Sequence, residues 1–254
     1  MSCHVEIVGK GPSLVLLHGW GMHSGVWQHL VKSLSEQYTL YLVDLPGMGQ
    51  SKSIEPYHLH TIAESVAEVI PGVSDILGWS MGGLVAQCIA LTQPERVRRL
   101  ILVGSSPKFI ESADWRHGIT AENFNSFAKE IDLNYKEAML KFLTLQCMKA
   151  KDAKATIRQL RHSFDAKPAP SHATLKRSLD ILLKTDLRED VSRLRKPVLL
   201  IHGDRDTLAP VGAAHWMSQN LPIAYLRVMA GAAHAPFLSH TQQFVDTLNQ
   251  FLEP

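Results

Sequence analysis

The sequence is poor in cysteine, in long apolar runs and in net charge. Its three cysteines, Cys3, Cys88 and Cys147, form no CxxC pair, which argues against a zinc site and a disulfide framework and fits a reducing compartment. We expect them to be packing residues. The longest apolar runs, such as residues 14–17 and 198–201, are far shorter than the about 18 residues that cross a bilayer, so no membrane association is expected.

Positive and negative charges nearly cancel, since 26 Lys and Arg face 24 Asp and Glu and leave a net charge of +2. A domain that neutralises many phosphates needs a larger positive excess, so nucleic acid is not an expected partner. The segment Met1–Glu6 lacks the basic stretch and following apolar stretch of a secretory signal. These features predict a cytoplasmic protein.

The chain does have the composition of a compact globular protein, with 254 residues, 45% hydrophobic and 20% charged. Short continuous apolar runs alternate with segments of helical spacing, a pattern typical of buried parallel strands and the helices that cover them. The first hundred residues thus predict strands at Leu14–Leu17, Leu40–Val43, Ser74–Leu77 and Leu100–Val103, and helices at Trp27–Leu34, Ile62–Ile70 and Gly82–Leu91.

This alternation stops near residue 108 and returns near residue 191. Between these points apolar residues recur only at helical intervals, with a turn expected at Lys167–Pro170. We therefore predict an α/β fold with a mostly parallel sheet flanked by helices, built from residues 1–107 and 191–254, and an all-helical cap formed by residues 108–190. The second part of the core is expected to contain strands at 198–201 and 224–228 and helices at 213–220 and 242–251.

The segment Gly78–Gly83 fits the G-x-S-x-G nucleophile elbow, with Ser80 between a predicted strand and a predicted helix. The sharp strand-to-helix turn forces the serine into a strained backbone conformation and requires small neighbours two positions away, which Gly78 and Gly82 provide. The helix N-terminus then favours a developing anion. Ser80 is the candidate nucleophile.

A serine hydroxyl needs a base and a carboxylate that orients the base, in the chain order Ser, acid, His on this architecture. Asp204 and Asp206 follow one predicted strand and His234 follows the next, at the sheet edge that also presents Ser80. We favour Asp206 because it lies deeper in the loop, and interpret Asp204 as a turn residue. His234 is the candidate base.

The oxyanion needs two N–H donors, which we expect to be the backbone amides of Met81 and Trp20, the latter in a glycine-rich turn after the first predicted strand. Other chemistries have weak support. The phosphate-loop-like segment Pro46–Ser53 lacks the glycine required before Lys52, Gly19–Gly21 lacks the third glycine of a dinucleotide fingerprint, and no HExxH motif occurs. No cofactor and no metal are expected.

Five motifs together resemble the pimeloyl-acyl-carrier-protein methyl ester carboxylesterases of biotin synthesis, a family of serine hydrolases in the α/β-hydrolase superfamily. They are Leu16–Gly21, Val43–Gly47, Gly78–Gly83, Phe142–Gln146 and Ala232–Phe237.

The resemblance implies a cytoplasmic, cofactor-free and monomeric esterase that removes the methyl group from a carrier-bound pimeloyl ester. It implies that Ser80, Asp206 and His234 form the triad. It also implies a substrate site formed by Trp20, Ser80, Met81, His234 and an acyl-pocket segment, Phe142, Leu143, Thr144, Leu145 and Gln146. The same triad serves broad short-chain carboxylesterases and carbon–carbon bond hydrolases, so these stay alternatives.

The cap also concentrates positive charge. Lys149, Lys151, Lys154, Arg158 and Arg161 face only Asp152, which gives this stretch +4 and the rest of the chain −2. Four of these cations recur at helical spacing beside an apolar stripe, so they share one face of a predicted helix. Acyl carrier proteins are acidic, and we expect Lys141, Lys151, Lys154, Arg158 and Arg161 to dock such a carrier; a merely solvated charged face is the alternative.

Overall fold

A computed structural model gives the structure of residues 3–150 and 153–253. In these ranges the chain forms one seven-stranded sheet of order β1-β3-β2-β4-β5-β6-β7. All neighbouring strands from β3 to β7 run parallel, and β1 alone pairs antiparallel, with β3. The strands are β1 Val5–Gly9, β2 Ser13–Leu17, β3 Thr39–Val43, β4 Ser74–Trp79, β5 Val97–Val103, β6 Val198–Gly203 and β7 Ala224–Met229.

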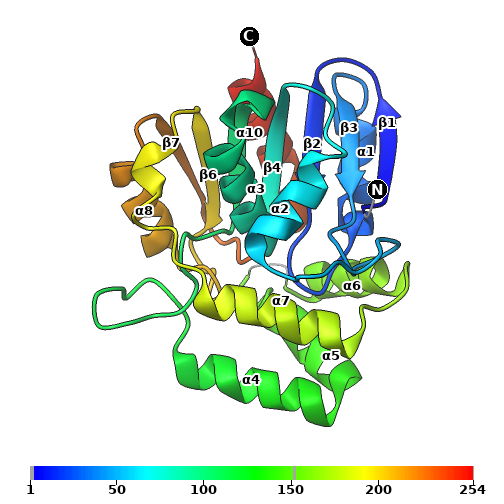
Figure 1. Cartoon of the computed structure of the whole chain (residues 1–254), viewed down its shortest axis with the longest axis vertical. Helices are drawn as coiled ribbons and strands as arrows, with labels where there is room; N and C mark the ends of the chain where they lie inside the picture. The colour runs from blue at the N-terminus through cyan, green and yellow to red at the C-terminus, as the bar shows by residue number, and fades with distance from the viewer. Residues whose placement is uncertain (1–2, 151–152, 254) are drawn as a thin grey trace.

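Helices connect and cover these strands (Figure 1). The α-helices are α1 Gln28–Leu34, α2 Leu59–Ala67, α3 Met81–Thr92, α4 Ala121–Leu133, α5 Tyr135–Leu145, α6 Ala153–Asp165, α7 His172–Lys184, α8 Val211–Asn220, α9 Pro236–Ser239 and α10 Thr241–Leu252. Short 3-10 helices are η1 Ser24–Trp27, η2 Pro94–Arg96 and η3 Val191–Arg193.

The predicted fold class is confirmed, and each predicted strand forms with its ends shifted by a few residues. The strand β1 was not predicted, because an edge strand with exposed Glu6 and Ile7 has no continuous apolar run. The helix predicted at Ile62–Ile70 begins three residues earlier, at Leu59. The turn predicted at Lys167–Pro170 lies between α6 and α7.

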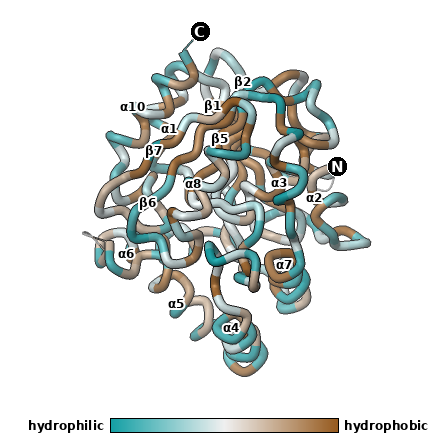
Figure 2. Tube along the Cα trace, turned by 90° about the vertical axis from the view of Figure 1, so that its left-hand side faces the viewer, coloured by the Kyte–Doolittle hydropathy of each residue, from teal (hydrophilic) through white to brown (hydrophobic). Residues whose placement is uncertain are grey.

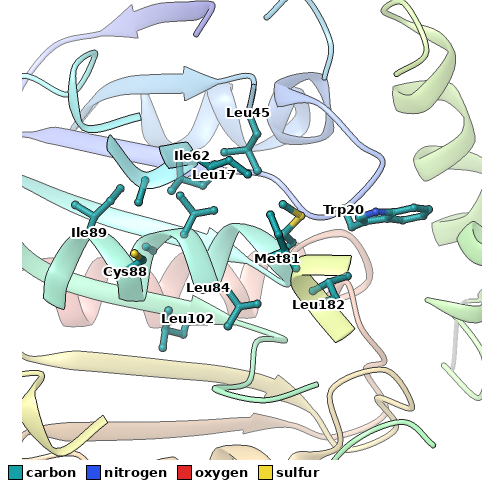
Figure 3. Packing of buried hydrophobic residues seen from close by; sticks show 14 of the residues in the cluster. Leu17, Trp20, Leu45, Ile62, Met81, Leu84, Cys88, Ile89, Leu102 and Leu182 are labelled. Atoms are coloured by element: carbon teal, nitrogen blue, oxygen red, sulfur yellow. The ribbon is translucent and has the colours of Figure 1, made fainter. Parts of the chain in front are cut away.

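Strand side chains alternate between two buried apolar clusters, one on each face of the sheet. In β2, Val15 and Leu17 belong to the cluster that α2, α3 and α8 cover, whereas Leu14 and Leu16 belong to the cluster that α1 and α10 cover. Figure 2 shows these hydrophobic strands enclosed by helices that turn polar surfaces outward. Figure 3 shows part of the first cluster, which reaches from Ile89 within α3 to Met81 at its start.

The helices α4, α5, α6 and α7, called the cap from here on, lie together beyond one end of the sheet (Figure 1). A buried ion pair joins them to the core. The Lys167 ammonium, between α6 and α7, donates to Asp44 Oδ2 at 3.0 Å and to Ser24 Oγ at 2.7 Å. Burial alone raises the pKa of Asp44, but its interaction with His18 and hydrogen bonds to backbone and side-chain donors outweigh burial and lower it to about 2.

Three further features bear on the function classes considered above. None of the helices in the described ranges combines the length and apolar character needed to cross a bilayer. All three cysteines are buried and none forms a disulfide. Burial raises the pKa of the Cys147 thiol to about 12, which keeps it protonated at neutral pH. Within residues 3–150 and 153–253, no cluster of three or more His, Cys, Asp or Glu side chains is arranged to hold a metal ion.

Candidate active site

Ser80 lies at the turn from β4 to α3 with φ 55° and ψ −119°, a conformation that non-glycine residues rarely adopt. Such a backbone costs about 1–3 kcal/mol and persists only where its surroundings enforce it. Here the Ser80 N–H donates to the Val103 carbonyl of β5 at 2.9 Å. A Cβ at Gly82 would lie 2.4 Å from the Leu17 carbonyl oxygen, so α3 can start this close to β2 only with glycine there. The sharp turn expected from the motif is present.

Asp206 and His234 meet in the loops that follow β6 and β7. The Nδ1–H of His234 donates to Asp206 Oδ2 at 2.8 Å, and both side chains are almost fully buried. The other carboxylate oxygen accepts the backbone N–H groups of Leu208 and Ala209 at 2.8 and 2.9 Å, so the carboxylate cannot rotate freely. Asp204, the competing candidate, is exposed and accepts the Gly231 N–H at 2.7 Å.

His234 is held beside the turn that carries Ser80. The indole N–H of Trp79 donates to the His234 carbonyl at 2.8 Å, and the His234 N–H donates to the Gln146 carbonyl at 3.0 Å. A Cβ on Gly104 would lie 3.1 Å from His234 Nδ1 and 3.2 Å from Asp206 Oδ2, which shows how closely the end of β5 approaches the pair.

Ser80 Oγ and His234 Nε2 make no hydrogen bond to each other in the described part of the chain. Catalytic hydrogen bonds are often long without substrate and tighten when it binds. The structure therefore brings Asp206 and His234 into direct contact and Ser80 into the same corner of the sheet.

The segments that carry the two predicted oxyanion donors lie next to Ser80. Met81 is the first residue of α3, so its N–H is one of the four that have no acceptor within the helix, and it lies where the helix dipole favours an anion. The turn after β2 lies against the nucleophile, since a Cβ on Gly19 would be 3.2 Å from Ser80 Cβ. Trp20 follows in this turn, and its indole N–H donates to the Leu175 carbonyl of α7 at 3.2 Å.

His18 braces this turn. Its Nδ1–H donates to the Gly19 carbonyl at 2.8 Å, and its Nε2 accepts the Leu45 N–H at 2.9 Å, so the ring is a neutral tautomer with no proton on Nε2. Burial lowers the pKa of His18 to about 4, against the opposing effect of Asp44. This histidine is fully occupied in holding the loop and is not available as a base.

A pocket of about 800 Å³ connects Ser80 to the cap. Its wall next to the nucleophile is aromatic: the ring of Trp20 packs edge-on against Phe142 of α5 at 5.0 Å and Phe127 of α4 at 5.5 Å. Further apolar side chains come from α4, α5 and α7. Polar and charged side chains also line the pocket, among them Glu130 of α4, Glu137, Lys141 and Thr144 of α5, and Thr207 of the loop after β6. The pocket is therefore suited to an elongated, mostly apolar acyl chain.

The segment Phe142–Gln146 divides between the pocket and the interior, which differs from the expectation that all five residues line the pocket. Phe142, Thr144 and Leu145 line it. Leu143 is fully buried in the apolar cluster that also contains Leu14 and Leu16. It points away from the pocket because successive helical residues point about 100° apart. Gln146 is buried, and its side-chain amide has no hydrogen-bond partner among the described residues; its carbonyl holds His234. Met81 likewise turns its side chain into the core (Figure 3).

The predicted docking cations on α6 are exposed. Lys154, Arg158 and Arg161 make no ion pair or side-chain hydrogen bond within the described ranges, and Arg161 also lines the pocket together with Lys149. Lys151 lies outside the described residues. The positive face of α6 is therefore continuous with the pocket that contains Ser80.

Lys141 on α5 has different surroundings. Its ammonium lies 3.2 Å from a Glu130 carboxylate oxygen and 3.5 Å from one of Glu137, and the hydrogen bond from Glu130 raises the pKa of Lys141. These carboxylates neutralise it locally, so it contributes less free positive charge than the cations of α6.

Comparison with known proteins fits this geometry. The family model of the alpha/beta hydrolase fold matches residues 12–241. A pimeloyl-[acyl-carrier protein] methyl ester esterase of Nitrosomonas europaea is 44% identical over 96% of this chain and 97% of its own length, and one of Aeromonas salmonicida is 42% identical over 99% of this chain and its full length. The chain belongs to the pimeloyl-[acyl-carrier protein] methyl ester esterase family. This is a family of carboxylic ester hydrolases with the alpha/beta hydrolase fold.

Solved structures extend the fold similarity beyond this family. An esterase from Exiguobacterium antarcticum superposes with a TM-score of 0.90 at 26% identity, covering 98% of this chain and 94% of that one. A bromoperoxidase from Bacillus anthracis superposes with a TM-score of 0.89 at 24% identity, covering 99% and 95%. Because an esterase and a bromoperoxidase share the architecture, the fold alone does not determine the substrate.

Sequence reasoning missed several residues that shape the site. The pocket includes Phe124 and Phe127 of α4 and Leu179 and Leu182 of α7, whose helical spacing predicted burial but not the partner surface. Sequence reasoning also missed Ser105, the serine after β5 whose hydroxyl donates to the Ser80 carbonyl. The glycine and serines that follow this strand, residues 104–106, were the available signal.

Proposed function

We propose that this chain hydrolyses the methyl ester of pimeloyl-acyl-carrier protein to the free acid and methanol, in biotin biosynthesis. The observation that carries the proposal is that one pocket is lined by Ser80 at the corner of the sheet and by Lys149 and Arg161 at the cap. An uncharged methyl ester reaches Ser80 through apolar surroundings, while the negatively charged carrier and its phosphate-bearing arm stay near the cations. Relatives that are named for this activity and that match over nearly their full length support the same substrate.

The reaction proceeds as an acyl transfer through Ser80. The neutral imidazole of His234, oriented by Asp206, takes the Ser80 proton as the oxygen attacks the ester carbonyl, and the Trp20 and Met81 amides stabilise the tetrahedral anion. His234 then gives the proton to the departing methoxide, which leaves as methanol. Water attacks the acyl-enzyme by the same steps and releases the carboxylate.

The test uses purified pimeloyl-acyl-carrier protein methyl ester as substrate, with loss of the methyl group followed by intact-mass spectrometry. The wild-type chain should complete the reaction, and Ser80→Ala should lower kcat by at least about 10⁴-fold. The wild-type gene should also restore growth without biotin to a strain lacking its own pimeloyl ester hydrolase. Near-normal turnover by Ser80→Ala would refute the nucleophile assignment.

Substrate comparison separates this proposal from a broad esterase or a carbon–carbon bond hydrolase. We expect kcat/KM to be highest for the carrier-bound ester, lower for a free dicarboxylate monomethyl ester, and lowest for an acetate ester and a vinylogous diketone. A clear preference for either of the last two would replace the proposed substrate while leaving the triad in place.

A further inference from the structure

Ser105 lies two residues beyond the end of β5 and is fully buried against the nucleophile turn. Its hydroxyl donates a hydrogen bond to the Ser80 carbonyl at 2.9 Å. The same carbonyl oxygen accepts the Gly83 N–H, also at 2.9 Å, so both of its lone pairs are engaged. The mechanism described above assigns Ser105 no role.

The peptide group that Ser105 contacts also contains the predicted oxyanion donor. The carbonyl of Ser80 and the N–H of Met81 belong to one planar trans peptide unit and point in opposite directions. A donor on the carbonyl side therefore fixes the direction of the N–H on the other side. It also polarises the amide, which strengthens that N–H as a donor.

The packing around Ser105 keeps room for this hydroxyl. A Cβ on Gly83 would lie 2.3 Å from Ser105 Oγ and 2.5 Å from Ser105 Cβ, so only glycine at position 83 allows the contact. Gly83 stands outside the five-residue motif Gly78–Gly82, and the sharp turn itself does not require it. The hydroxyl is also not needed merely to satisfy a buried carbonyl, because the Gly83 N–H already does so.

We propose that Ser105 is a positioning residue for the oxyanion hole: its hydroxyl orients and polarises the Ser80–Met81 peptide so that the Met81 N–H binds the oxyanion of the transition state. The inference rests on the proposed function, in which Ser80 attacks an ester. It extends the catalytic apparatus, which already draws on the segments after β2, β4, β6 and β7, to the end of β5.

The decisive variant is Ser105→Ala, with Ser106→Ala as the matched control. Ser106 is also a buried serine, but its hydroxyl donates to the Lys108 carbonyl at 2.6 Å and makes no hydrogen bond to the nucleophile turn within the described ranges. Ser105→Ala should lower kcat about three- to tenfold on a small aryl ester and on the carrier-bound ester alike, with KM unchanged. Ser106→Ala should stay within about twofold of wild type in both constants.

Two readouts distinguish positioning from a merely structural role. The affinity of Ser105→Ala for a trifluoromethyl ketone, which forms a tetrahedral oxyanion on Ser80, should fall by the same factor as kcat/KM. The acid limb of its pH–rate profile should not move, because the Asp206–His234 hydrogen bond is intact. Ser105→Cys keeps a weaker donor of similar size, so its kcat and its affinity for the ketone should lie between those of the wild type and of Ser105→Ala. The cysteine variant replaces the alanine variant in the test if the latter folds poorly.

The outcomes separate this inference from the proposed function. If the wild-type chain hydrolyses no ester and a fluorophosphonate does not label Ser80, the proposed function fails. If the wild type is active and Ser105→Ala and Ser105→Cys keep wild-type kcat and ketone affinity, only the role of Ser105 is overturned, whether or not their melting temperatures fall.

Discussion

The strand ends of the core and the helices of the cap face the same pocket, but they are built differently. At the strand ends the reactive residues are buried and held by hydrogen bonds: the Asp206 carboxylate accepts three, and both backbone groups of Ser80 are held by the end of β5. On the cap, the charged side chains of α6 are exposed and free of partners within the described ranges.

The difference separates two tasks. Transition-state stabilisation needs groups fixed before the reaction, because reorganisation at the reacting centre costs rate. Electrostatic steering of a large partner works at longer range and tolerates mobile side chains. Changes at the strand ends should therefore lower kcat for every ester, whereas charge changes on α6 should affect only a carrier-bound ester.

The largest effect in this comparison is expected from Asp206→Asn. The asparagine oxygen can still accept the backbone N–H groups, but its NH₂ then faces His234 Nδ1 and donates to it. This favours the tautomer with the proton on Nε2, which cannot accept the proton of Ser80. We expect kcat to fall about 10³- to 10⁴-fold on small and carrier-bound esters alike, as measured by steady-state kinetics.

Asp204→Asn is the matched control for this variant. Asp204 lies in the same loop, and asparagine retains the oxygen that accepts the Gly231 N–H. Its kcat should stay within about twofold of wild type. Equal losses in the two variants would mean that the loop conformation, rather than the carboxylate facing His234, determines the rate.

The choice between these two aspartates shows how far the sequence reaches. Loop position after a strand was enough to place Asp206 and His234 at one sheet edge, since the carboxyl ends of parallel strands coincide. Alternating apolar runs were likewise enough for β2 to β7. The edge strand β1 was not predicted because three of its five residues are exposed, so its sequence pattern resembles that of a loop.

Other features have no local signal. The Lys167–Asp44 ion pair joins residues 123 positions apart, and nothing in either segment indicates that distance. The Ser105 hydroxyl reaches Ser80 only because β4 and β5 are neighbours in a particular register. By contrast, the burial of Leu143 could have been predicted from the sequence, because a helix cannot turn five consecutive residues toward one pocket.

Two buried histidines of the core should make the protein less stable in acid. Burial lowers the pKa of His18 and of His202 to about 4. For His18, the charge of Asp44 opposes this shift and His23 adds to it. For His202, Asp206 opposes the shift and His234 adds to it. The unfolded chain binds these protons below pH 6.5, whereas the folded chain does not until about pH 4. The free energy of unfolding should therefore fall across this window, by about 3 kcal/mol per histidine.

His202→Phe tests this expectation by denaturant unfolding between pH 7 and pH 4. Neither ring nitrogen of His202 makes a well-formed hydrogen bond to a described residue, and the nearby Ala209 backbone favours the charged form of the ring only slightly. An apolar ring of similar size should therefore fit at little cost in stability at pH 7. The variant should lose less stability in acid than wild type. His60→Ala, on the exposed surface of α2, is the control and should keep the wild-type pH dependence. Parallel curves for all three proteins would show that other groups cause the acid loss.

The smallest effect, and the one confined to the cap, is expected from reversing Lys154 and Arg158 to Glu. The double variant reverses two of the exposed cations of α6 and keeps Arg161, so the pocket wall and the strand ends stay unchanged. At low ionic strength kcat/KM on the carrier-bound ester should fall about tenfold relative to the wild type. Added salt should reduce this difference in kcat/KM, because screening weakens the attraction between exposed charges. Hydrolysis of a small methyl ester should not change.

Lys10→Glu with Lys32→Glu makes the same change in net charge on exposed residues outside the cap, next to β1 and in α1. If this control lowers carrier-bound activity as much as the α6 reversal does, net charge rather than the α6 face governs encounter. If the α6 variant loses activity on the small ester to the same extent, the cations act on the pocket itself and the division of tasks between core and cap fails. Loss restricted to the carrier-bound ester and to the α6 variant is the result that a docking face requires, because no other arrangement makes the effect depend on both the partner and the position of the charge.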